Sequence, residues 1–220
     1  MIRDFGIVWS ERDLLLSGLA NTTILSVLSA GAALLLGFML TPALMSKRRP
    51  LAFAARGFVD GMRCVPFLLF AYIVYYGLPS LGIRLDNWTS GLLALTIYNA
   101  AYMAEILRAG WSGIPPGQIE AARAFGYSGF RLLRRIMLPQ VVIAVGPVIG
   151  NQLIQLIKDS AFLSIITIPE LTFAANFIQS RNFRAFEAYF VATGIYLVLA
   201  VLLRQAMRGL GAWLVFGRRP

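Results

Sequence analysis

The sequence contains no histidine, a single cysteine and few charged residues. Without histidine the chain lacks the commonest general base and the commonest metal ligand, and the lone Cys64 excludes an internal disulfide framework. Only 14% of the residues are charged and 58% are hydrophobic, whereas soluble domains carry about 25% charged residues. One domain of this length has too little interior to hide so much apolar surface from water, so a soluble monomer is nearly excluded.

The apolar residues gather in long stretches that carry no charge. A membrane-spanning helix needs about 20 apolar residues, and a backbone in hydrocarbon must satisfy its own hydrogen bonds. We therefore predict an all-α, polytopic membrane protein, with residues 1–220 forming a single transmembrane domain. The five expected transmembrane helices cover about residues 18–44, 62–82, 88–108, 137–157 and 187–205.

The formal net charge of +10 suggests either a membrane protein or an unusual nucleic-acid binder. In the five-span arrangement, 14 basic and three acidic residues flank the spans on one side, including Arg218 and Arg219, and the other side has a net charge of −1. Basic residues in short loops stay in the cytoplasm, which predicts an N-out, C-in orientation. Because the charge flanks spans, nucleic-acid binding is disfavoured.

Residues 160–180 contain only one charged residue, Glu170, and could be read as a sixth span. That reading would move the C-terminal arginines to the side with the uncharged loops, against the charge rule. We therefore expect a short helix, or a re-entrant piece broken at Pro169, packed on the outer face.

The loop at residues 112–136, between the third and fourth spans, contains two helix-start signals and a stop. Pro115 and Pro116 can open a helix, and Gly126 can end it in a left-handed conformation. A second short helix with three arginines then leads into the fourth span. Spacing alone leaves two interpretations open: an interfacial amphipathic hairpin that anchors the protein, or a docking element on the cytoplasmic face.

Several motifs in this chain, in a fixed order, resemble those of one protein family. The loop contains Glu120-Ala121-Ala122, Gly126 and Leu138-Pro139-Gln140, preceded by Ile114-Pro115-Pro116-Gly117-Gln118. Gly18-Leu19-Ala20-Asn21-Thr22-Thr23, Tyr75-Tyr76-Gly77-Leu78-Pro79 and Ala101-Tyr102-Met103-Ala104-Glu105 are similar to further landmarks. Together they resemble the permease subunits of ABC importers, in the polar amino acid (His/Glu/Gln/Arg/opine) permease family.

The resemblance implies a transport subunit, not an enzyme, in a bacterial inner membrane, which moves a polar amino acid or a derivative by alternating access. Its implied partners are two ABC ATPase subunits, a second permease subunit (identical or related), an extracytoplasmic solute-binding protein and the lipid bilayer. By the same resemblance, the ATPase-coupling residues are Gly117, Glu120, Ala121, Ala122 and Gly126.

No cofactor is expected on this chain. A phosphate-binding Walker loop needs Gly-Lys followed by Ser or Thr, and the two lysines, Lys47 and Lys158, are not preceded by glycine. ATP and Mg²⁺ are therefore expected on the partner ATPase subunits.

A polar stripe on the fourth span is the candidate substrate path. Asn151, Gln152, Gln155, Lys158 and Asp159 fall within an arc of about 120° on a helical wheel. Lys158 and Asp159 could pair with the carboxylate and ammonium of an amino acid. The alternative is that both are interfacial charges and the amides join helices.

Two residues of the third span extend this candidate path. Asn99 lies near the middle of that span and Tyr102 one turn further in, so both could line the same cavity or pack against another span. Glu105 and Arg108, three residues apart, are expected to form a helix-surface ion pair.

Two other function classes were weighed. An intramembrane enzyme would need clustered acids, histidines or a nucleophile with a base, and here the ten acids are scattered. An ATP-independent secondary transporter or channel subunit is the alternative for transport, but it would leave the loop motif without a purpose.

Overall fold

The computed structural model describes residues 5–216, so Arg218 and Arg219 lie outside the described residues. This part of the chain is nearly all helical and contains no strand, which confirms the all-α class. In chain order the elements are α1 (Gly6–Ser10), α2 (Arg12–Leu44), α3 (Arg49–Cys64), α4 (Phe67–Tyr72), η1 (Ile73–Gly77), α5 (Leu78–Ser80), α6 (Asn87–Ser112), α7 (Pro116–Ala124), α8 (Gly129–Leu132), η2 (Leu133–Met137), α9 (Leu138–Ser160), η3 (Ala161–Ile166), α10 (Leu171–Asn182) and α11 (Ala185–Phe216).

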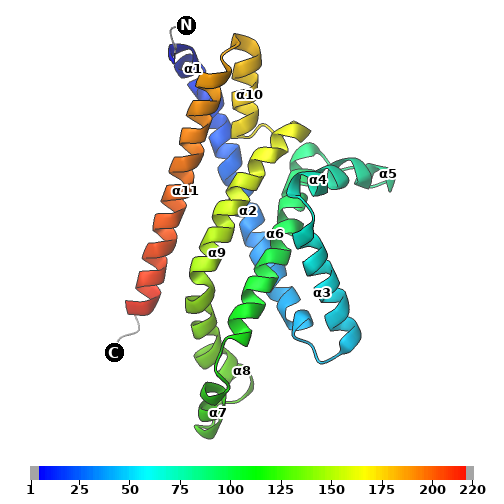
Figure 1. The fold of residues 1–220 in the computed structure, drawn as a ribbon, viewed down its shortest axis with the longest axis vertical. Helices are drawn as coiled ribbons and strands as arrows, with labels where there is room; N and C mark the ends of the chain where they lie inside the picture. Colours follow the sequence, from blue (N-terminus) through cyan, green and yellow to red (C-terminus); the bar gives the residue numbers. More distant parts are fainter. Residues whose placement is uncertain (1–4, 217–220) are drawn as a thin grey trace.

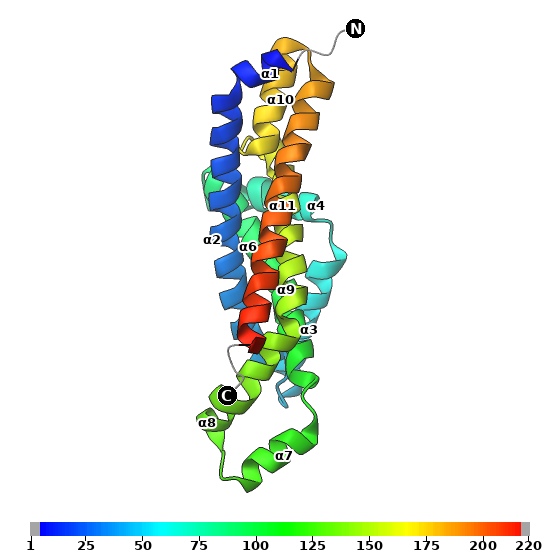
Figure 2. The same cartoon turned by 90° about the vertical axis from the view of Figure 1, so that its left-hand side faces the viewer.

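The long helices α2, α6, α9 and α11 run side by side (Figures 1 and 2). Among residues 5–216, four segments are long and apolar enough to cross a membrane: Arg12–Leu44, Asn87–Ser112, Gly129–Ile166 and Ala185–Trp213. The pair α3 and α4–α5 counts as a fifth if a bent span is allowed. The polytopic helical fold is therefore confirmed, and the N-out, C-in orientation stays a prediction.

The second expected span, residues 62–82, is broken in the structure. Arg49–Cys64 and Phe67–Ser80 meet at an angle of 109°, and α4–α5 lies across the long helices in Figure 1. The cause is Pro66, which has no N–H and forces Val65 into an extended conformation (φ −91°, ψ 136°). The Tyr98 hydroxyl of α6 donates to the Val65 carbonyl (3.1 Å) and satisfies a group that the break leaves free.

The core of the bundle is the contact between α2 and α6, where small residues let the two backbones approach. A Cβ added to Gly37 of α2 would lie 2.7 Å from the Met103 Cβ and 2.9 Å from the Ala104 nitrogen of α6. Packing of this kind drives helix association in lipid, where the hydrophobic effect between helices is weak. The Ala33 and Ala100 side chains are buried at the same seam.

At the other end of the bundle from α7, the segment after α9 folds as the 3₁₀ turn η3 and the short helix α10. Pro169 lies in the turn between these two elements. Glu170 caps α10 by accepting hydrogen bonds from the Thr172 and Phe173 amides (2.9 and 2.7 Å). The Tyr196 hydroxyl of α11 also donates to Glu170 (2.6 Å), so this fully buried carboxylate ties α10 to α11.

Candidate functional site

The first part of the site is the hairpin of α7 and α8, which projects from one end of the bundle (Figure 2). Pro116 occupies the first position of α7, as its fixed φ and missing N–H favour. The helix ends at Ala124, and Gly126, just beyond the Phe125 cap, has a φ of +79°. The Tyr127 amide donates to the Ala122 carbonyl (3.0 Å) and the Gly126 amide to the Arg123 carbonyl (2.9 Å). This is a Schellman ending, which needs the left-handed conformation that glycine adopts without strain.

The two faces of α7 differ. Ala122 is buried, and Ile119 packs beside the cluster of Ile114, Val141 and Val145, so this face rests on the chain's own helices. The other expected coupling residues, Gly117, Glu120, Ala121 and Gly126, are exposed. The structure thus presents a short helix that is fixed on one side and free on the other.

Two aromatic side chains at this end were missed by the sequence analysis. Phe125, beside the Gly126 turn, is 84% exposed, and Phe130 on α8 is 71% exposed. Equally exposed apolar side chains occur elsewhere on the chain, such as Phe53 (81%) and Phe183 (88%), so exposure alone assigns these two no role. The sequence signal that could have singled out Phe125 was its position next to Gly126, the glycine predicted to end the helix.

The hairpin is continuous with a long membrane helix. From Gly129 to Ile166 the chain forms one helical segment that includes α8, η2 and α9. The turn η2 is π-helical and contains Arg134 and Arg135. The α8 end of the hairpin and α9 therefore belong to one helical segment.

The second part of the site is the polar stripe, most of which the structure brings together. Gln152 of α9 donates to the Asn99 Oδ1 of α6 (2.9 Å), and Asn99 itself is fully buried. Gln155 donates to the Asp159 Oδ1 (2.9 Å). Gln152, Gln155 and Asp159 are separated by three and four residues and therefore lie on one face of α9.

Asp159 and Lys158 have different environments. Asp159 is 4% exposed, and its second oxygen, Oδ2, is buried without a hydrogen-bond partner. Lys158, the preceding residue, is exposed. An unpaired buried carboxylate oxygen is costly unless a donor or a cation meets it. The two residues that were expected to meet the substrate's carboxylate and ammonium thus differ in burial.

Tyr102 contacts Tyr98 and Arg63 rather than the residues of the stripe. Its hydroxyl lies 3.2 Å from that of Tyr98 and donates to the Arg63 carbonyl (3.4 Å), while the Arg63 guanidinium lies 5.8 Å from the Tyr102 ring centre. Glu105 and Arg108 form the expected pair, with two hydrogen bonds of 2.6 and 2.7 Å. α6 thus carries three separate polar groups: Asn99 with Gln152, Tyr102 with Tyr98 and Arg63, and Glu105 with Arg108.

The chain is similar to known transport proteins over most of its length. The family described as binding-protein-dependent transport system inner membrane component matches residues 33–214. The chain is 32% identical over 197 residues to the probable glutamine ABC transporter permease protein GlnM of Bacillus subtilis (strain 168), covering 90% of this chain and 91% of that protein. It is 34% identical over 201 residues to the arginine transport system permease protein ArtQ of the same organism, covering 91% and 92%.

Solved structures agree. One titled "Crystal structure of an amino acid ABC transporter with histidines" superposes with a TM-score of 0.89 at 32% identity, covering 96% of this chain and 99% of that one. An inward-facing MetNI methionine ABC transporter structure superposes with a TM-score of 0.69 at 20% identity over 94% of this chain and 97% of that one, which shows the shared fold.

Proposed function

The chain belongs to the family of binding-protein-dependent transport system inner membrane components, and from this premise we propose how its residues divide the work of import. It is a multi-pass membrane permease subunit of an amino-acid ABC importer, and it is not an enzyme, because the ATPase is a separate subunit. It works with ATPase subunits and a solute-binding protein. The proposed assembly has two ATPase subunits and a second, identical or related permease, in a bacterial inner membrane with the N-terminus outside.

In this proposal α7 is the coupling helix. Gly117, Glu120, Ala121 and Ala122 belong to it and Gly126 ends it, while ATP and Mg²⁺ are bound by the partner ATPase. The observation that carries the proposal is that α7 has an exposed face and is followed in the chain by one helical segment, Gly129–Ile166. Closure of the ATPase subunits would press on α7, and the stiff segment would tilt α9, which exposes the polar stripe alternately to the two sides of the membrane.

The same proposal assigns substrate contact to the stripe. The Oδ2 of Asp159 has no hydrogen-bond partner, so the ammonium of a polar amino acid can meet it there. Gln152, Gln155 and Asn99 would supply hydrogen bonds, Tyr102 would line the path, and Lys158, exposed outside the Gln155–Asp159 pair, would meet the substrate carboxylate only at the entrance.

The coupling role is tested with Glu120→Lys in a purified complex that contains the ATPase and binding-protein partners. Reversing an exposed charge at a docking surface removes attraction and adds repulsion. We expect uptake into liposomes to fall at least tenfold, while this chain still inserts and ATP hydrolysis no longer responds to the substrate-loaded binding protein.

The matched control is Asp13→Lys. It reverses a carboxylate whose side chain is 89% exposed, in the first turn of α2, at the end of the bundle away from α7 (Figure 1). Uptake should stay close to the unmodified level in this variant. Normal uptake and normal ATPase stimulation in Glu120→Lys would rule out α7 as the coupling element.

A further inference from the structure

The unpaired oxygen of Asp159 is closed off in this structure. Asp159 is 4% exposed, and its Oδ2 atom is buried without a hydrogen-bond partner. A substrate ammonium can therefore reach this atom only after some part of the chain has moved.

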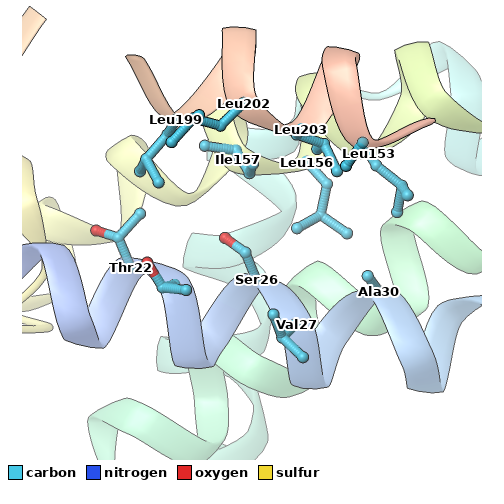
Figure 3. A pocket seen from close by; sticks show the side chains of 12 residues that line it. Thr22, Ser26, Val27, Ala30, Leu153, Leu156, Ile157, Leu199, Leu202 and Leu203 are labelled. Carbon is cyan, nitrogen blue, oxygen red and sulfur yellow. The ribbon is translucent and has the colours of Figure 1, made fainter. Parts of the chain in front are cut away.

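The groove on the α11 side of α9 gives a polar substrate no suitable route to this oxygen. The groove lies between α2, α9 and α11, and Figure 3 shows the side chains that line it. Its walls on α9 and α11 are formed by apolar side chains such as Leu153, Ile157 and Leu202. Charged groups are costly to place against an apolar surface. The substrate is therefore expected to reach Asp159 from another side.

The helix α4 covers the face of α9 that carries Asp159. Leu156 and Leu163 lie three residues before and four residues after Asp159, so the three residues share one face of the helical segment. Phe67 and Ala71 of α4 belong to the same buried cluster as these two leucines.

Two further neighbours of Asp159 are also covered by α4. Tyr98 of α6 is close enough to Asp159 for the two to interact electrostatically. The Phe67 ring centre lies 5.2 Å from that of Tyr98 and 6.5 Å from that of Phe162, three residues after Asp159. Displacing α4 would therefore uncover the surroundings of Asp159 on both α6 and η3.

The segment formed by α4, η1 and α5 (Phe67–Ser80) is bounded at both ends by residues that lie outside helices. At one end Val65 and Pro66 are extended, and the chain turns by 109° there. At the other end residues 81–84 are all exposed, and Gly82 has a φ of +84°. Hinges are typically a few loop or element-terminal residues of this kind, which absorb changes in φ and ψ.

Two hydrogen bonds in series fasten this segment to the bundle. The Tyr75 hydroxyl of η1 donates to the Asn87 Oδ1 (3.1 Å), and the Asn87 Nδ2 donates to the Thr167 hydroxyl. Asn87 is the first residue of α6, and Thr167 follows η3 directly. Thr167 is β-branched and has a φ of +59°, a conformation that persists only where surrounding contacts hold it.

We propose that Phe67–Ser80 is a lid over Asp159, which turns about Val65–Pro66 and residues 81–84 and is held closed by the Tyr75–Asn87–Thr167 hydrogen bonds. This inference rests on the proposed contact between Asp159 and the substrate. When the two bonds break, α4 lifts from Tyr98, and the Asp159 oxygen becomes accessible to the substrate ammonium.

Opening of the lid is measured by labelling a cysteine on its inner face. Ala71 is 1% exposed, so Ala71→Cys, in a Cys64→Ser background, reacts with a charged methanethiosulfonate reagent only when α4 lifts. In the complete importer, Tyr75→Phe should raise the labelling rate about three- to tenfold, the effect of one net hydrogen bond. The matched control is Tyr76→Phe, which removes the neighbouring hydroxyl outside this pair of bonds and should leave the rate unchanged.

Locking the lid tests its role in transport. Phe67→Cys and Phe162→Cys, at two residues whose rings contact each other, are joined by a bifunctional methanethiosulfonate reagent in the same background. Uptake into liposomes should fall at least tenfold and return when the cross-link is reduced. The same treatment of Asn176→Cys and Tyr189→Cys, which join α10 to α11, should leave uptake unchanged.

Two results would overturn the lid: equal labelling rates in Tyr75→Phe and Tyr76→Phe, or uptake that continues while Phe67→Cys and Phe162→Cys are cross-linked. If Tyr75→Phe does not assemble, Asn87→Ala breaks the same connection from α6 and carries the same expectation. Labelling reports the movement of α4 and does not depend on Asp159. If Asp159 made no contact with the substrate, Asp159→Asn would leave uptake normal while the labelling rates still differed, so the two proposals fail separately.

Discussion

Two exposed glycines, Gly117 in α7 and Gly126 just after it, should respond in opposite ways to alanine. A Cβ at Gly126 or at Gly117 would meet no other atom within 4 Å, so neither substitution creates a clash. They differ in backbone conformation, because Gly126 has φ +79° and Gly117 lies inside α7. The pair therefore isolates backbone energetics from packing.

The magnitude follows from the backbone. A left-handed conformation costs an L-residue roughly 1–2 kcal/mol, so Gly126→Ala should raise the equilibrium for opening the end of α7 about 5- to 30-fold. Gly117→Ala should instead favour the helix by up to about 1 kcal/mol. Asparagine tolerates the left-handed region better than alanine does, so Gly126→Asn should recover part of the loss.

Hydrogen exchange monitored by mass spectrometry provides the assay. The amides of Gly126 and Tyr127 close the Schellman turn, and their exchange should accelerate by this factor in Gly126→Ala and be unchanged or slower in Gly117→Ala. Equal exchange rates in the two variants would refute the claim that Gly126 is required for its backbone conformation. Uptake should fall as the turn is lost, so Gly126→Ala should lower it more than Gly126→Asn does.

Two further predictions concern the polar stripe. Asp159→Asn should lower uptake about ten- to a hundredfold, because the substrate ammonium loses a charge-assisted partner. Lys158→Gln, at an exposed position, should have a much smaller effect. Equal effects of the two variants in a liposome uptake assay would contradict the assignment. Asn99→Leu and Gln152→Leu should each lower the free energy of unfolding, measured in mixed micelles. The double variant should lose about 0.6 kcal/mol less than the sum of the two single losses, because the Gln152–Asn99 hydrogen bond is lost only once. Strictly additive losses would show that this bond contributes nothing.

The sequence carried much of the fold and the approximate bounds of α7. Pro116 and Gly126 mark the start and end of α7 through properties of single residues, a fixed φ and access to positive φ, which do not depend on tertiary context. The three-residue spacing of Glu105 and Arg108 likewise predicted their ion pair, because both partners lie on one helix.

The stripe was predicted less completely. Helical spacing identified the face of α9 that carries Gln152, Gln155 and Asp159, but it could not show that Asn99 would be the partner of Gln152. Nor could it show that Asp159 is buried while Lys158 is exposed. Adjacent residues on a helix point in directions about 100° apart, and only the neighbouring helices decide which one is buried.

The sequence by itself determined that this chain is a helical membrane protein, because long uncharged stretches have no other stable arrangement in hydrocarbon. It also determined where α7 begins and ends. Only the tertiary structure decided how far the chain turns at the Pro66 break, an angle of 109°, and which helix supplies the hydroxyl that pairs with the Val65 carbonyl there. Both depend on contacts between residues far apart in the chain, and the periodicity of a single segment contains no information about which helix it will meet.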